Sequence, residues 1–93
     1  MTKLEQLKTD MRSEFEKYKK LQNELNNRHD MIVGCLNRIA VSDDEKEVER
    51  YYNDLINRSI KEYKDKAREC HKQWLVYDEI FEEYAKEKYQ CLS

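Results

Sequence analysis

The chain has 93 residues, enough for one small domain, and 41% of them are charged, against about 25% in an average globular protein. Its 18 basic and 20 acidic residues give a net charge of −2, which lacks the basic field of a general nucleic-acid binder. One glycine, Gly34, and no proline leave few turns, and the abundant Glu, Lys, Leu and Gln favour long helices. We therefore predict a single all-α domain over residues 1–93.

The sequence has no targeting or membrane signal. Residues 1–5 contain no apolar signal core, and no run approaches the roughly 18 apolar residues of a membrane span. Cys35, Cys70 and Cys91 are widely and irregularly spaced, unlike a secreted disulfide framework. These features predict a soluble, cytoplasmic protein that does not contact a membrane.

A heptad series marks the first helix. Apolar side chains recur at intervals of seven, at Leu4, Met11, Tyr18, Leu25, Ile32 and Ile39. Further apolar residues, such as Leu7, Phe15 and Leu21, follow three or four positions later. This spacing predicts a helix over about residues 3–40 with one apolar seam.

A turn and a second helix follow. The series stops at Ala40, and Ser42 with Glu45 matches a capping box, so we expect a turn at about residues 40–43. The second helix is predicted from about 43 to 90. Its register slips by about one residue between Ile56 and Ile60, which allows a kink near residues 57–59. Two interleaved series run along it, Ile60, Ala67, Trp74, Phe81 and Tyr63, Cys70, Tyr77, Tyr84.

A short loop between two amphipathic helices predicts a long, antiparallel, coiled-coil-like hairpin. With the turn centred near residue 41, facing residues have numbers that add to about 82. This rule places Phe15 against Ala67, and Trp74 across Leu7 and Met11. Since the second helix is longer, its end at about residues 81–92 is expected to project beyond the first helix.

The apolar surface of the second helix extends beyond one seam, to Tyr51, Leu75, Val76 and Ile80. A helix that is apolar on several sides usually has several neighbours, and a two-helix core is marginal. We expect either a homodimer that forms a four-helix bundle or a host protein that receives this face.

The aromatic end of the second helix is the predicted interaction surface. Aromatic residues are enriched at interface hot spots. The predicted partner-binding residues are Trp74, Tyr77, Asp78, Ile80, Phe81, Glu82, Tyr84, Tyr89 and Leu92. The alternatives are that Trp74 belongs to the hairpin core and that the acidic residues form a solvated face.

Metal binding and catalysis lack a motif. Among the possible ligands only Cys70 and His71 are adjacent, and neighbouring helical residues point about 100° apart. There is no Gly-rich phosphate loop and no nucleophile motif. We predict no catalytic residues, no metal or cofactor and no small-molecule substrate.

These patterns favour a non-enzymatic protein–protein interaction module that acts as a stoichiometric adaptor, assembly factor or inhibitor. The small size suits an inhibitor from a virus or mobile element. One alternative is a nucleic-acid binder that uses the basic residues between Arg58 and Lys72, or an acidic mimic of nucleic acid. Another is a structural coiled-coil subunit of a larger complex.

Overall fold

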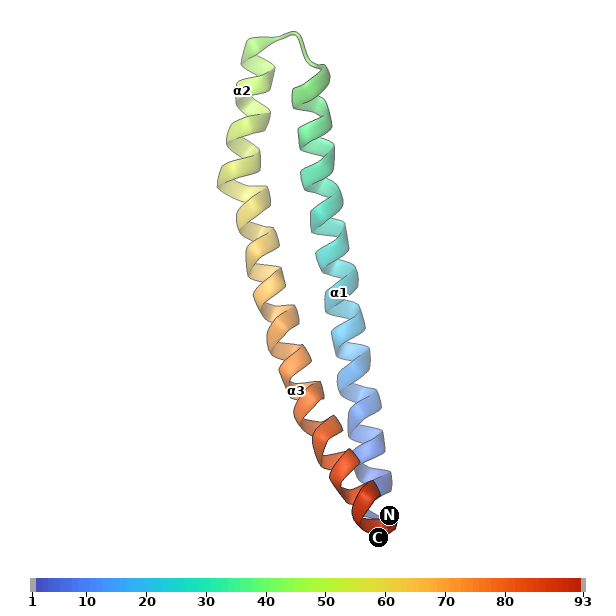
Figure 1. Cartoon of the computed structure of the whole chain (residues 1–93). Coiled ribbons are helices and arrows are strands. Elements are labelled where there is room, and N and C mark those ends of the chain that lie inside the picture. Colours follow the sequence, from blue (N-terminus) through green and yellow to red (C-terminus); the bar gives the residue numbers. More distant parts are fainter. Residues whose placement is uncertain (1, 93) are drawn as a thin grey trace.

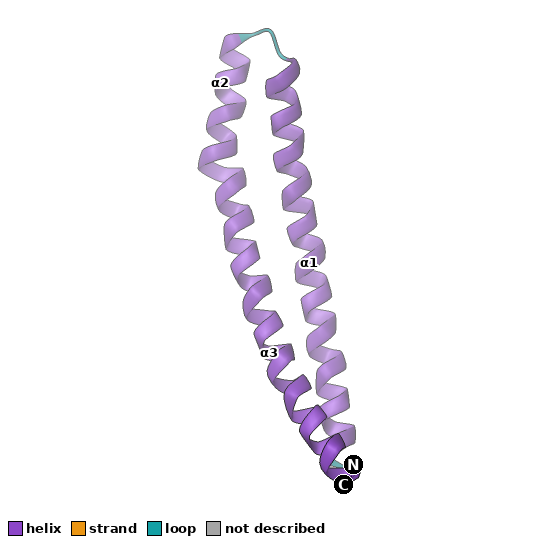
Figure 2. Ribbon diagram, viewed as in Figure 1, coloured by secondary structure: helices purple, strands orange, loops and turns teal. Residues whose placement is uncertain are grey.

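The computed structural model describes residues 2–92, with side chains up to Gln90. The elements are α1 (Lys3–Val41), α2 (Glu45–Asp54), the π-helical segment η1 (Leu55–Ser59) and α3 (Ile60–Leu92). The last three form one continuous arm that runs back along α1, and the described residues contain no strand (Figures 1 and 2). The predicted all-α antiparallel hairpin is therefore confirmed, as a rod of 68 × 20 × 16 Å.

Helix α1 forms because its apolar residues recur every seven positions along good helix formers. Thr2 caps its start, where Oγ1 accepts a hydrogen bond from the Glu5 backbone N–H at 3.1 Å. At its other end, the Ser42 N–H donates to the Arg38 carbonyl.

The loop at residues 42–44 differs in detail from the predicted capping box. The N-cap of α2 is Asp44, whose carboxylate accepts the Lys46 N–H at 3.0 Å. Ser42 instead ends α1, and its hydroxyl accepts the Asp44 N–H at 3.3 Å. The chain reverses through three residues before the new helix begins, so the cap lies two positions later than expected.

The π-helical segment accommodates one extra residue. Val48 and Leu55 are spaced by seven, as are Tyr63, Cys70 and Tyr77, but Leu55 and Tyr63 are eight apart. The Ile60 N–H donates to the Leu55 carbonyl, five residues back. A π-bulge is the usual way to absorb one residue within a helix. It lies where the sequence shows the register slip.

The two arms end nearly together, so the predicted overhang from Phe81 is wrong. Lys3 Nζ lies 3.0 Å from Glu87 Oε1, and both termini lie at the same end of the rod (Figure 1). Facing numbers add to about 90 instead of 82. The later turn and the π-helical residue raise the sum, and side chains that lean toward their own helix N-terminus add about two more.

The core of this hairpin is thin. Among residues 2–90, only Leu7, Leu55 and Cys70 are buried apolar side chains, with Ser59 as the buried polar one. None of the described side chains is less than 2% exposed. Each helix buries one stripe only, as two helices without a third neighbour must.

Candidate interaction surface

The contacts between the arms follow a regular register. Phe15, Gln22 and His29, seven residues apart on α1, contact Tyr77, Cys70 and Tyr63 of α3 in turn. The ring centroids of Phe15 and Tyr77 are 5.4 Å apart, those of His29 and Tyr63 are 6.3 Å apart, and Cys70 Sγ lies 3.4 Å from Gln22 Oε1. The residue numbers of each pair add to 92. Phe15 therefore does not face Ala67, as the sequence rule had placed it.

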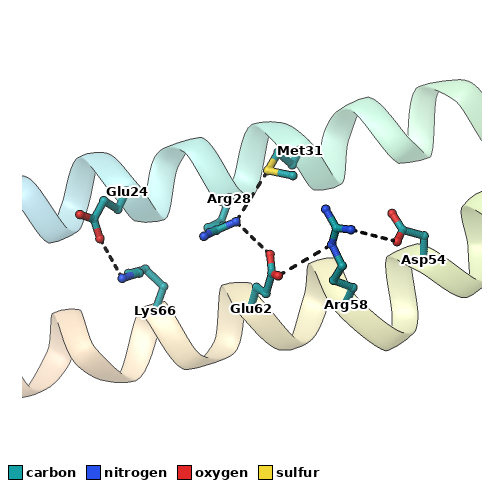
Figure 3. Close-up of polar contacts among 7 residues, drawn as sticks. All are labelled: Glu24, Arg28, Met31, Asp54, Arg58, Glu62 and Lys66. Carbon is teal, nitrogen blue, oxygen red and sulfur yellow. Dashed lines mark hydrogen bonds and ion pairs between the residues drawn. The ribbon is translucent and has the colours of Figure 1, made fainter.

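Polar pairs close one edge of this seam, which we call the back edge. The pairs that cross between the arms there are Lys3–Glu87, Glu14–Gln73, Glu24–Lys66 and Arg28–Glu62. At about 100° per residue, the four α1 members fall within one sector of that helix, and so do the four α3 members. Figure 3 shows Glu24 and Arg28 reaching from α1 to Lys66 and Glu62.

The charges on the back edge are shared among several partners. Glu62 lies 2.9 Å from Arg28 and 3.8 Å from Arg58, which also approaches Asp54 at 4.0 Å (Figure 3). The hydrogen bond from Lys66 lowers the pKa of Glu24, and the carboxylates of Glu24 and Glu69 raise the pKa of Lys66. At the lower end of the rod, the hydrogen bond and charge of Glu87 raise the pKa of Lys3.

The opposite edge, which we call the front edge, is aromatic and open. It carries Phe15 from α1 and Ala67, Trp74 and Phe81 from α3. Phe15, Trp74 and Phe81 are 39%, 42% and 46% exposed. The ring centroid of Trp74 lies 5.4 Å from the ring centroid of Tyr18 and 5.5 Å from that of Tyr77. The front edge is therefore a row of aromatic rings in contact with one another. No ion pair crosses between the arms on this edge of the described chain.

Helical geometry explains why the two edges differ. Cys70 points into the seam, and Gln73 and Trp74 follow it by three and four residues, which places them on opposite flanks of the same helix. Position 73 and its equivalents are mostly polar, whereas position 74 and its equivalents are Ile60, Ala67, Trp74 and Phe81, with a charge only at Lys88. On α3 the sequence thus directs mostly polar residues to one flank and apolar residues to the other, whereas on α1 the equivalents of Phe15 include Gln22 and His29.

A shallow, open hollow of about 320 Å³ lies on the front edge beside Trp74. It is lined by Tyr18, Leu25, Ala67, Cys70, His71 and Trp74. The small side chain of Ala67 leaves this space between the two arms. Its size suits one large side chain, and its lining combines apolar side chains with the imidazole of His71.

The predicted interaction residues fall on different sides of α3. Trp74 and Phe81 lie on the front edge, and Tyr77 lies in the seam. Ile80 is half-buried on the opposite flank. Asp78 and Tyr84 are half-buried, and Lys88 Nζ lies 5.9 Å from the Tyr84 ring. Glu82 and Tyr89 are exposed, and the side chain of Leu92 lies outside the described residues.

Phe15 and Ala67 are the front-edge residues that the sequence analysis does not assign to the interaction surface, because the facing rule places them against each other in the hairpin core. The signal for Phe15 is its position four residues after the seam residue Met11, which is the same offset that separates Trp74 from Cys70. Trp74 also contacts Tyr18, not Leu7 and Met11 as the facing rule had placed it.

Half of the basic residues between Arg58 and Lys72 already have acidic partners. Arg58 approaches Asp54 and Glu62, Lys66 pairs with Glu24 and Glu69, and Arg68 lies 3.0 Å from Asp65. Each such pair reduces the positive charge that this stretch offers to phosphate groups. This weakens the nucleic-acid alternative relative to an apolar docking surface.

Other kinds of site find no support in residues 2–90. No three His, Cys, Asp or Glu side chains come together there as metal ligands. None of the described helices combines the length and apolar character needed to cross a membrane. Comparison of the chain with protein-family models, curated proteins and solved structures gave no match.

Proposed function

We propose that this chain is a non-enzymatic protein–protein interaction module whose front edge packs against helices of another polypeptide. The supporting observation is that Phe15, Trp74 and Phe81 stay 39–46% exposed on one edge, while polar pairs close the other. Aromatic side chains bury large areas at low entropy cost and dominate interface energetics. A row of aromatic side chains exposed to water is typical of a docking surface.

Such a module would act stoichiometrically, as an adaptor, assembly factor or inhibitor. A helix is the fitting partner element, because the front edge is a long, straight strip between two helices. A further helix packed along this strip would bury the aromatic rings. The hairpin would then become part of a helical bundle whose core is shielded from water. The partner's apolar stripe would fill the hollow beside Trp74.

Site-specific photo-cross-linking in the native cell tests this proposal. Leu75 and Val76 are adjacent and similarly exposed, at 48% and 42%, but point about 100° apart, Leu75 toward the front and Val76 toward the back. With p-benzoylphenylalanine in place of Leu75, we expect one-to-one protein adducts. The same group in place of Val76 should give several-fold fewer. Equal yields at the two positions, or no adduct at either, would contradict the proposal.

A further inference from the structure

The outward side of α3, next to the front edge, carries a stripe whose charge reverses along the helix. Its residues are alternately three and four apart, so they lie on one face. In chain order they are Lys61, Lys64, Arg68, His71, Leu75, Asp78 and Glu82. We call this the outer stripe. It is basic before Trp74 and acidic after it, with His71 and Leu75 in the middle.

The charges at both ends of the outer stripe are available for contacts with another molecule. Within residues 2–90, Lys61, Lys64, Asp78 and Glu82 have no ion-pair partner. Arg68 has only the neighbouring Asp65, in a pair whose side chains are 70% and 56% exposed. The back edge differs, because its charges face each other across the seam.

The order of the charges makes the outer stripe complementary to itself in one orientation. When a second α3 lies antiparallel to the first, with facing residue numbers that add to about 146, Lys64 meets Glu82 and Arg68 meets Asp78. The same contacts recur on the other side of the dyad, as an isologous interface requires. In a parallel arrangement, Lys64 would face Lys64 and Asp78 would face Asp78, which is repulsive.

Uncharged side chains lie at the centre of this antiparallel pairing. The dyad falls between His71 and Leu75, so Leu75 of one copy reaches His71 of the other. Trp74 and the hollow beside it flank the same point on the front edge. An apolar centre with charged residues toward both ends is the usual anatomy of a stable interface.

We infer that the occupant of the front edge is a second copy of this chain, with the two α3 helices antiparallel and the dyad near residues 71–75. This inference rests on the proposed function, because it names the polypeptide that the front edge receives. The product is a four-helix bundle in which the Trp74 side chains of the two copies lie near the dyad.

Charge reversal along the outer stripe tests both the dimer and its orientation. Light scattering and sedimentation of the purified chain should give twice the 11.5 kDa mass. The double variant Lys64→Glu, Arg68→Glu should raise the dimer dissociation constant at least about tenfold, because it places like charges together. Adding Asp78→Lys and Glu82→Lys inverts all four charges that pair across the dyad, and self-association should return.

Mixing the native chain with the fourfold variant distinguishes the two orientations. In the antiparallel dimer, mixed pairs bring like charges together, so native mass spectrometry should detect the two homodimers and almost no heterodimer. Preferential heterodimers would overturn the antiparallel arrangement. A monomeric native chain at about 100 μM, well above a micromolar dissociation constant, would overturn the dimer itself.

The control reverses charges off the stripe. Lys72 and Glu79 lie about 100° round the helix from His71 and Asp78, away from the front edge. The pair Lys72→Glu, Glu79→Lys should leave the mass unchanged, and circular dichroism should confirm that every variant is helical. A monomeric chain that still gives front-specific adducts at Leu75 would reject the dimer and keep the proposed function, whereas a chain that neither self-associates nor gives such adducts would reject both.

Discussion

Gln73 holds Glu14 through two hydrogen bonds from one amide nitrogen. Its Nε2 lies 2.6 Å from the Glu14 carboxylate and 3.0 Å from the Glu14 backbone carbonyl. Lys17, one turn later on α1, approaches the same carboxylate at 3.1 Å. Glu14 occupies a position where the seven-residue pattern would otherwise place an apolar residue, so this contact lets a charged group lie beside the seam.

The Glu14 contact predicts a loss of stability in acid. The hydrogen bond from Gln73, helped by that from Lys17, lowers the pKa of Glu14 below its ordinary 4.5. A group with a lowered folded-state pKa stabilises the fold above its unfolded pKa and loses that effect as the pH falls through the folded value. The free energy of unfolding should therefore fall below about pH 4.5.

Urea unfolding between pH 7 and pH 3 measures this effect. The free energy of unfolding of the Glu14→Gln variant should fall less steeply than that of the native chain below about pH 4.5. Glu16→Gln is the matched control, because Glu16 lies on the same turn with its side chain 70% exposed. Parallel curves for the native chain and Glu14→Gln would show that Glu14 does not contribute to the acid dependence.

Gly34→Ala should stabilise the protein. Gly34 lies inside α1, and a Cβ added there would meet no heavy atom within 4 Å. Alanine in a helix interior is favoured over glycine by about 1 kcal/mol, because the unfolded chain loses less freedom on folding. Thermal unfolding followed by circular dichroism should show a higher Tm, and a lower Tm would contradict the open surroundings of Gly34.

The fold class was predictable because one signal repeats many times. Seam residues such as Tyr18 and Leu25 recur every seven positions along α1, and a single break near Ser42 leaves only one way to reverse the chain. Each repeat is independent support for the same helix. An error at one position does not change the outcome.

The register and the two edges were not predictable, since they depend on small offsets and distant partners. The turn at residues 42–44, the π-helical residue and the tilt of side chains each shift the pairing, so Phe15 meets Tyr77 instead of Ala67. Glu14 and Arg28 interrupt the apolar pattern, but their partners lie 59 and 34 residues away. Only the folded arrangement shows that these interruptions collect on one side.

Deleting Asn57 should leave the hairpin intact. The deletion restores a spacing of seven between Leu55 and the present Tyr63, so the π-helical segment can become regular α-helix without rotating either end. We expect a free energy of unfolding within about 1 kcal/mol of the native value, since no buried group is removed. Deletion of the exposed Asn23 in α1 is the control, and it should strongly destabilise the fold, because α1 has no π-helical segment to absorb the change and the residues after position 23 turn about 100° away from the other arm. Similar damage from both deletions would mean that the segment has a structural role of its own.

Leu55 should matter more to stability than Glu62, although Glu62 makes two ion pairs. Leu55 is 6% exposed, and truncation of a buried leucine to alanine costs about 2–5 kcal/mol. The Glu62 side chain is 37% exposed, and ion pairs in such positions contribute less than about 1 kcal/mol because water screens them. Urea unfolding of Leu55→Ala and Glu62→Ala at one fixed protein concentration compares the two costs. If Glu62→Ala proved the more damaging, the back edge would hold the arms together more strongly than the apolar seam, and the thin core would not be the main source of stability.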